Sequence, residues 1–318
     1  MGFGILHMRG VQGKEGWRWL FLIEGAITAV IGLWSFLVMP PAPTKTASWF
    51  RGKDGWFTPR EETIIVNRVL RDDPSKGGMH NRQPLNWNML WKSLTDVDLW
   101  PIYIIGLVWG LPSSPVDTYL TLTLRSIGFT TFETTLMVLP KQFLHLIFLL
   151  AITYISARFD ERSLCGMSAQ VWILVCLIPL RVFGAKSSRW SKYVVTTLLL
   201  SYPSTHAIQV GWTSRNSNSV RTRTVSSALY NMFCQLSGII ASYVYRADDK
   251  PLYHRGNSVL IGIAVLNLFV YGGVKFYYIW RNKRRDAVWN ALTAQERETY
   301  LLTTTDQGSR RLDFRFAH

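Results

Sequence analysis

The sequence predicts an all-α membrane protein, because its apolar residues form long runs instead of recurring at the spacing of soluble helices or strands. A helix needs about 20 mostly apolar residues to cross the hydrocarbon core of a bilayer. Six windows approach this length with few or no charges. They comprise residues 19–39, 134–156, 164–180, 193–213, 224–245 and 257–274.

A seventh window, 99–124, is apolar at its start but is interrupted near its centre by Pro112, Ser113, Ser114, Pro115 and Asp117. Proline removes a backbone donor and disrupts a helix interior, so this window predicts a broken helix. The opening run, residues 1–8, is too short to span a membrane and lacks the charged leader of a signal peptide. We interpret it as the end of a further helix.

The net charge of +15 would by itself suit a nucleic-acid-binding protein. However, the Lys and Arg residues lie mostly between the apolar runs, where cationic residues hold spans at the cytoplasmic face. No nucleic-acid partner is therefore expected. More of these residues lie in segment 41–98 and in the tail from Arg281 than in the connections on the other side. Both segments are predicted to be cytoplasmic.

Cysteine usage and catalytic motifs give no sign of an enzyme. Cys165, Cys176 and Cys234 all fall within predicted spans and show no metal or disulfide spacing. We interpret them as apolar packing residues and expect no metal site and no cofactor. Serine, histidine and aspartate occur, but no motif joins them as a nucleophile with its base.

Two capping boxes predict short helices outside the spans. Thr58, Pro59 and Glu61 place a capping hydroxyl, a first-turn proline and a third-position acid in order. Thr293 and Glu296 repeat the hydroxyl and the acid in the tail. The first of these helices carries an apolar face, which suits the membrane surface or the ends of the spans. We interpret both helices as structural braces.

Polar side chains inside the spans are costly in a bilayer, so each is a candidate for function or for hydrogen bonding between helices. Lys141 and His145 lie four residues apart and share a helical face near the centre of their span. Two further pairs at helical spacing occur in later spans. We expect all six side chains to bind substrate; the alternatives are a lysine that snorkels to the interface and interhelical hydrogen bonds. The candidates are Lys141, His145, His206, Gln209, Asn231 and Gln235.

Two titratable groups are candidates for carrying a proton. Asp117 lies in the broken window, and its alternative role is that of an interfacial acid near the outer end of the span. His145 is the second candidate, because an unperturbed histidine titrates near neutrality. A lysine beside titratable groups at membrane depth suits the binding of an anion between helices and a change of protonation there.

Short motifs along the whole chain carry a family resemblance. They are Gly-Trp-Arg-Trp at 16–19, Arg-Glu-Glu at 60–62, Asp-Leu-Trp-Pro at 98–101, Arg-Thr-Arg at 221–223, Tyr-Arg-Ala-Asp-Asp at 245–249 and Arg-Leu-Asp-Phe-Arg-Phe-Ala-His at 311–318. These motifs resemble the fungal allantoate, nicotinate and pantothenate permeases, an anion:cation symporter branch of the major facilitator superfamily. The resemblance covers nearly the whole chain.

The resemblance implies a major facilitator fold, of which this chain supplies the C-terminal six-helix half plus helix 6 and the end of helix 5. Residues 1–40 would close the N-terminal half, 41–98 would form a central cytoplasmic loop with an amphipathic helix, 99–280 would form helices 7 to 12, and 281–318 would form a cytoplasmic tail. It also implies secondary transport of a small organic anion, a carboxylate or vitamin precursor, by proton-coupled alternating access. The partners would be the lipid bilayer, the anion and protons, in the plasma membrane.

One family motif is altered. The loop after the eighth helix of the family resembles Asp-Arg-x-Gly-Arg, whereas this chain has Ala157 in place of the acid and Asp160 in place of the glycine. The resemblance still implies that Arg158 and Arg162 brace a cytoplasmic gate.

Three other interpretations remain open at this stage. A seven-helix receptor would have the same topology, although no receptor signature is present. An integral-membrane enzyme would need a catalytic constellation that the sequence lacks. A truncated, transport-inactive product would lack the first four helices of a twelve-helix fold.

Overall fold

The computed structural model describes residues 2–72, 87–126, 128–184, 187–217, 220–250, 252–304 and 308–318. Within these ranges the regular structure is helical, apart from an isolated antiparallel bridge between Ser48 and Gly52. The prediction of an all-α protein is confirmed. The chain forms two compact units, Met1–Arg82 and Gln83–His318, and each is described by itself.

The first unit contains one membrane-length helix and one amphipathic helix. Its elements are α1 (Gly2–Leu6), η1 (Val11–Gly13), α2 (Gly16–Val38) and α3 (Pro59–Asp72). Helix α2 is mostly apolar, with Arg18 and Glu24 as its charged residues, and matches the predicted span 19–39. Helix α3 starts at the predicted capping sequence, where the Glu61 carboxylate accepts hydrogen bonds from the backbone and hydroxyl of Thr58.

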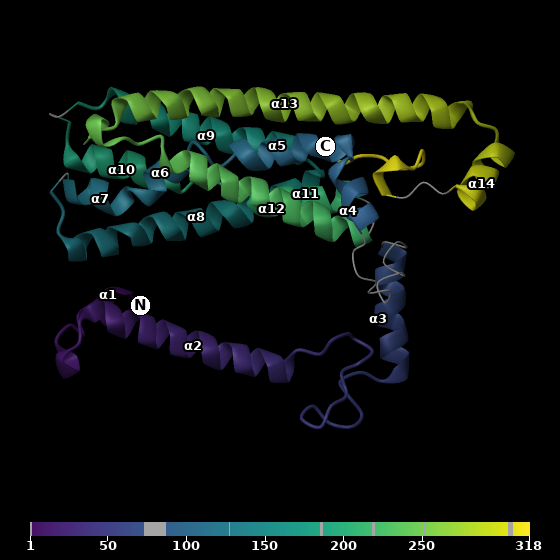
Figure 1. The fold of residues 1–318 in the computed structure, drawn as a ribbon, viewed down its shortest axis with the longest axis horizontal. Coiled ribbons are helices and arrows are strands. Elements are labelled where there is room, and N and C mark those ends of the chain that lie inside the picture. The colour runs from purple at the N-terminus through teal and green to yellow at the C-terminus, as the bar shows by residue number, and fades with distance from the viewer. Residues whose placement is uncertain are drawn as a thin grey trace. The chain divides into compact units, whose positions relative to one another are not determined.

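The second unit is a bundle of helices that run along a shared direction (Figure 1). Its elements are α4 (Trp87–Leu94), η3 (Val97–Leu99), α5 (Trp100–Val108), α6 (Ser114–Thr118), α7 (Leu120–Ser126), α8 (Thr131–Phe159), α9 (Ser163–Val182), α10 (Arg189–Leu200), α11 (His206–Ser217), α12 (Val220–Ser242), η4 (Ala247–Asp249), α13 (His254–Ala291), α14 (Ala294–Thr303) and η5 (Gly308–Arg310). In the described part of the whole chain, four helices are long and apolar enough to cross a membrane, namely α2, α8, α9 and α13.

Two predicted spans are interrupted. The window 99–124 is divided into α5, α6 and α7, as its prolines predicted. The window 193–213 was expected to be continuous, and this expectation was wrong: α10 ends at Leu200 and α11 begins at His206, with Pro203 between them. Proline has no N–H to donate and disfavours a helical conformation in the residue before it. Two helix breaks thus lie inside the bundle.

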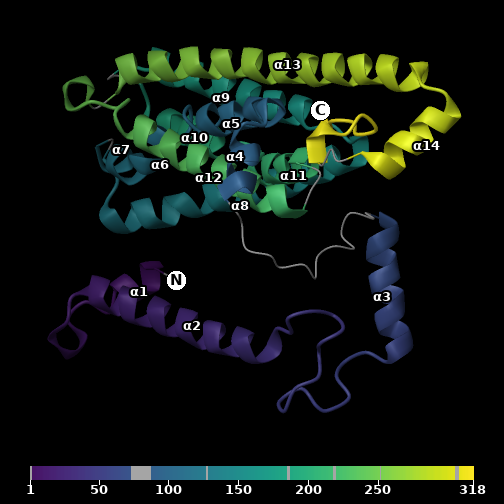
Figure 2. The same ribbon diagram turned by 45° about the vertical axis from the view of Figure 1, so that its right-hand side comes forward.

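The last predicted span is longer than expected. Helix α13 continues well past residue 274 and reaches Ala291. It packs along α9, and both views show the two helices side by side (Figure 2). The contact depends on Gly166, because a Cβ atom there would lie 2.1 Å from the Tyr271 ring of α13. Small residues allow helices to approach closely in this way in membrane proteins.

Buried side chains form two main clusters, one toward each end of the bundle. One cluster includes Leu99, Tyr103, Trp212, Tyr278 and Phe316, and we call this the tail end because residues 308–318 pack there. The other includes Leu124, Phe129, Leu177, Tyr245 and Tyr253 and lies at the opposite, loop end. The two helix breaks lie between these clusters. The second unit therefore has one buried cluster on each side of its helix breaks.

Candidate substrate cavity

A cavity of about 510 Å³ lies where the two helices are interrupted. Its size falls within the range of small-molecule sites, about 300 to 1,000 Å³. Both breaks contribute to its lining, together with α8 and α12. Several lining side chains carry hydroxyl groups, namely Ser113, Ser114, Thr118, Ser204 and Ser237. The cavity is thus suited to a polar ligand.

Lys141 and Asp117 form an ion pair in the wall of this cavity. The Lys141 Nζ donates a hydrogen bond to Asp117 Oδ1. The lysine side chain is 9% exposed and the aspartate side chain 54% exposed, so the cation lies inside the protein and its counter-ion faces the open space. The lysine side chain thus lies in the cavity wall and is directed toward α6. Its counter-charge in this state comes from α6.

Two histidines line the same cavity. His145 lies one turn along α8 from Lys141, and its Nδ1 is buried without a hydrogen-bond partner in the described part of the chain. The His206 ring lies between Trp109 and Tyr230, with ring centroids 5.6 Å from each. Its Nδ1 is 3.2 Å from the Tyr230 hydroxyl oxygen. The aromatic packing fixes the orientation of the His206 ring at the cavity wall.

The other three candidates lie outside the cavity lining. Gln209 is buried and makes hydrogen bonds between helices: its Nε2 donates to Tyr271 and Thr205, and its Oε1 accepts from Tyr230. Asn231 and Gln235 have exposed side chains on α12. The structure therefore brings together Lys141, His145, His206 and Asp117, and not these three amides.

Two further amides, which the sequence reasoning missed, support the break between α5 and α6. Gln170 Nε2 donates to the Trp109 carbonyl at 3.0 Å, and Asn267 Nδ2 donates to the Val108 carbonyl at 2.9 Å. The two amides also bond to each other at 3.0 Å. Carbonyls freed by a helix break need partners at membrane depth, and these side chains supply them from α9 and α13. Their only sequence signal is a neutral amide within an apolar span.

The loop between α8 and α9 carries the predicted gate residues. Asp160 accepts hydrogen bonds from Arg162 at 2.8 Å and from Arg215 of α11 at 3.0 Å. The bond from Arg162, followed by the charges of both guanidinium groups, lowers the pKa of Asp160. Arg158 is exposed at the end of α8. The loop is thus tied to α11 through Asp160.

The backbone conformation of Asp160 suits the glycine that the family motif has at this position. Its φ is 52° and its ψ is 29°, a left-handed conformation that glycine adopts most easily and aspartate tolerates better than most residues. The adjacent Glu161 pairs with Lys275 of α13 at 2.6 Å. Asp160 thus occupies a backbone conformation that glycine also adopts, and the loop joins α8 to both α11 and α13.

Three membrane-length helices packed with interrupted ones, and a polar cavity at the two helix breaks, form an architecture that is typical of secondary transporters. The chain belongs to the Major Facilitator Superfamily, because residues 5–242 match that family. It is therefore a multi-pass membrane protein.

Fungal relatives carry transporter names. The chain is 45% identical over 317 residues to "Uncharacterized transporter YIL166C" of Saccharomyces cerevisiae, which covers 99% of this chain and 58% of that relative. It is 44% identical over 215 residues to "Putative uncharacterized transporter YOL162W" of the same yeast, covering 67% of this chain and 100% of the relative. "MFS-type transporter cnsO" of Penicillium expansum is 24% identical over 290 residues, 90% of this chain and 55% of the relative. No solved structure matches the chain significantly.

Proposed function

We propose that this chain forms the C-terminal six-helix half of a secondary transporter that carries a small organic anion together with a proton across the plasma membrane. The chain spans little more than half of the YIL166C relative, so the activity proposed is that of the whole transporter. The resemblance to allantoate, nicotinate and pantothenate permeases suggests a carboxylate. The observation that carries the proposal is the ion pair of Lys141 and Asp117 in the cavity wall.

The net charge of the cavity couples the binding of the anion to the binding of the proton. In the empty cavity, Lys141 and Asp117 neutralise each other. A bound carboxylate alone would leave the cavity with one net negative charge, and a bound proton alone would leave one net positive charge. Either imbalance becomes costly when the cavity closes around its contents, because Lys141 is buried and a closed cavity no longer solvates Asp117. When both bind, protonated Asp117 is neutral and Lys141 pairs with the carboxylate, so the loaded cavity is again neutral.

The remaining lining residues have proposed supporting roles. His145 lies one turn from Lys141, where it serves as a second proton carrier or contacts the substrate. His206 presents its ring at the cavity wall, held between Trp109 and Tyr230. The hydroxyl groups around them favour an anion with hydrogen-bonding groups along its length over an apolar one. Arg162, bonded to Asp160, and the adjacent Arg158 are the proposed gate residues.

Uptake by a full-length protein tests this proposal. We suggest a chimera in which this chain replaces the matching part of YIL166C, purified and reconstituted into liposomes. Uptake of labelled allantoate, nicotinate and pantothenate would be measured from about pH 5 to 8, the range in which histidine titrates, at fixed membrane potential and fixed ionised substrate. We expect saturable uptake of at least one acid, faster at lower external pH.

Two variants and one control sharpen the test. Lys141→Gln is expected to weaken uptake affinity by about 10- to 150-fold, because a charge-assisted hydrogen bond contributes roughly 1.5 to 3 kcal/mol. Asp117→Asn is expected to make the remaining uptake independent of pH. Asn290→Ala, at an exposed position near the end of α13 and outside the cavity lining, is the matched control and should transport like the parent. A pH-independent parent, or a Lys141→Gln variant with parental affinity, would refute the proposal.

A further inference from the structure

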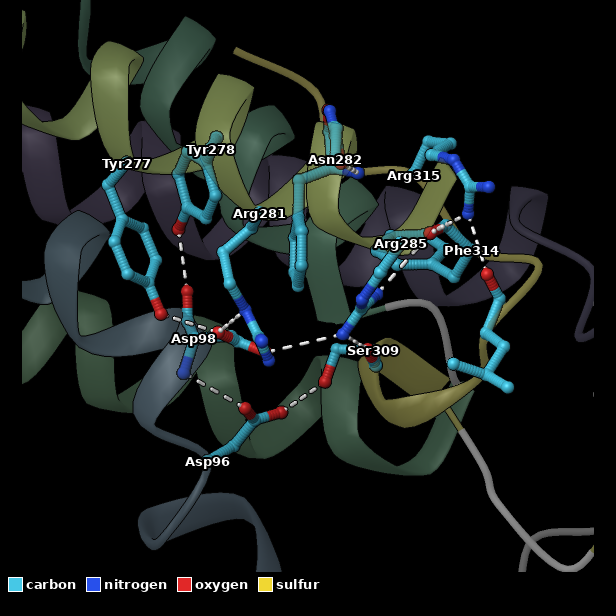
Figure 3. Close-up of polar contacts among 12 residues, drawn as sticks. Asp96, Asp98, Tyr277, Tyr278, Arg281, Asn282, Arg285, Ser309, Phe314 and Arg315 are labelled. Carbon is cyan, nitrogen blue, oxygen red and sulfur yellow. Dashed lines mark hydrogen bonds and ion pairs between the residues drawn. The ribbon is translucent and has the colours of Figure 1, made fainter. Parts of the chain in front are cut away.

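The C-terminal motif at 311–318 has no part in the cavity, yet it is among the most extensively bonded segments of the described chain. Residues 308–318 pack against the tail end of the bundle, beside η3 and the second half of α13 (Figure 3). Phe316 is 2% exposed. The segment is therefore a fixed part of the tail end.

Asp98, just before α5, is the centre of the ionic contacts. Its carboxylate accepts two hydrogen bonds from Arg281, at 2.9 and 2.8 Å, and one from the Tyr277 hydroxyl at 2.6 Å. Arg285 lies 3.4 Å from the same carboxylate. Both arginines and the tyrosine come from α13 (Figure 3). The start of α5 is thereby joined to α13.

Arg285 connects this ionic centre to the C-terminal segment. It is 6% exposed, and it donates to the carbonyls of Ser309 at 2.6 Å and Phe314 at 3.3 Å. Its guanidinium also lies 4.6 Å from the centre of the Phe316 ring. A buried guanidinium that loses partners is strongly disfavoured. Docking of residues 308–318 and the contact between Asp98 and Arg285 are therefore coupled through one side chain.

The side-chain amides of two asparagines each donate to a backbone carbonyl of the segment and accept from the N–H of the same residue. Asn282 of α13 donates to the Phe316 carbonyl and accepts from the Phe316 N–H, both at 2.8 Å. Asn216 of α11 donates to the Ala317 carbonyl at 3.2 Å and accepts from its N–H at 2.9 Å. Trp212 Nε1 donates to the same carbonyl at 2.8 Å. The segment thus bridges α11 and α13.

We propose that residues 308–318 form a latch that holds the tail-end parts of α5 and α11 to α13. These are the two half-helices whose breaks line the cavity. With the latch docked, α5, α11 and α13 move as one body. With the latch released, α11 loses its bridge to α13, and the start of α5 keeps only the contacts of Asp98 with Arg281 and the tyrosines of α13. This inference does not depend on which solute the cavity binds, or on whether it binds one.

Hydrogen exchange on the detergent-purified chain tests the latch. We would compare the parent with a variant that ends at residue 307, reading amides in α5, α11 and, as an internal reference, α9. Exchange in α5 and α11 is expected to become at least about tenfold faster, with α9 unchanged, as for a local opening. Adding a synthetic peptide of residues 308–318 should restore protection, whereas a scrambled peptide should not.

A point substitution covers the case in which the shortened chain fails to fold. Phe316→Ala removes the buried ring and should accelerate exchange in the same two helices, whereas Leu302→Ala, at a residue 80% exposed in α14, is the matched control and should leave exchange unchanged. Unchanged exchange in α5 and α11 of the Phe316→Ala variant would overturn the proposal. Equal acceleration in α9 would also overturn it, because the segment would then stabilise the whole bundle.

Discussion

The ion pair in the cavity wall predicts an asymmetry between two charge deletions. Asp117→Asn keeps the shape of the side chain and one acceptor oxygen, but it leaves the Lys141 ammonium, 9% exposed, without a counter-charge. Lys141→Gln leaves the Asp117 carboxylate, which is 54% exposed and can be solvated within the open cavity. The first substitution should therefore be the more destabilising, although both remove the same ion pair.

The expected losses of stability follow from the energies of buried and exposed ion pairs. Breaking a buried pair costs about 3 to 5 kcal/mol, and an exposed pair contributes about 0 to 1 kcal/mol. Because one partner is buried and the other half-exposed, we expect Asp117→Asn to cost about 1 to 3 kcal/mol and Lys141→Gln less than about 1 kcal/mol. For a unit of this size, 1 kcal/mol shifts the Tm by about 2 to 4 °C, so Asp117→Asn should lower it by about 2 to 12 °C.

Thermal unfolding in detergent measures this difference. Cys165 is buried and Cys176 and Cys234 are partly buried, so a thiol-reactive fluorescent dye reports the opening of the bundle. The double variant Asp117→Asn with Lys141→Gln removes both charges and should recover much of the Tm lost by Asp117→Asn alone. A Tm for Asp117→Asn equal to that of the parent, or a larger loss for Lys141→Gln, would refute the reasoning.

Two more predictions concern contacts between helices of the bundle, namely the packing of α9 on α13 and the ion pairs of Asp160. Gly166→Ala places a methyl group against the Tyr271 ring, and this overpacking should lower the stability by about 1 to 3 kcal/mol. The control is Gly262→Ala on α13, where no atom lies within 4 Å of the new Cβ, and it should be neutral or slightly stabilising. Equal Tm values for the two variants would contradict the close packing of Gly166 on Tyr271. The pKa of Asp160 is lowered mainly by Arg162, so its ionised form stabilises the fold above the ordinary aspartate pKa of about 3.9, and this stabilisation is lost as the pH falls through the lower folded value. The Tm difference between the parent and Asp160→Asn, followed from pH 7 to 3, should therefore narrow at the acid end; a constant difference would count against the ion pair.

Local signals in the sequence predicted much of the fold. Long apolar runs marked the spans, two prolines marked the break before Asp117, and the capping sequence at Thr58 marked the start of α3. The break at Pro203 was missed because one proline in an apolar run allows either a kinked helix or an interruption. Packing, which the sequence does not display, decides between them.

The candidate site was predicted in part, for a related reason. Helical spacing placed Lys141 and His145 on one face, and both line the cavity. Spacing alone does not say which face of a span meets a neighbouring helix. The polar side chains of Gln209 and the exposed Asn231 have the same helical spacing to a second polar residue, and they were therefore predicted as site residues too. The pair of Gln170 and Asn267 joins residues 97 apart in the sequence, and no local pattern indicates such a partnership.

The length of α13 gives the bundle a mechanical property. A helix of 38 residues is about 57 Å long at 1.5 Å per residue, whereas the hydrocarbon core is about 30 Å thick. Roughly 25 Å of rigid rod therefore projects past the core, and a tilt of about 10° within the bilayer would displace the far end by about 4 Å. Such a rod converts a small rotation at membrane depth into a larger movement in the aqueous phase.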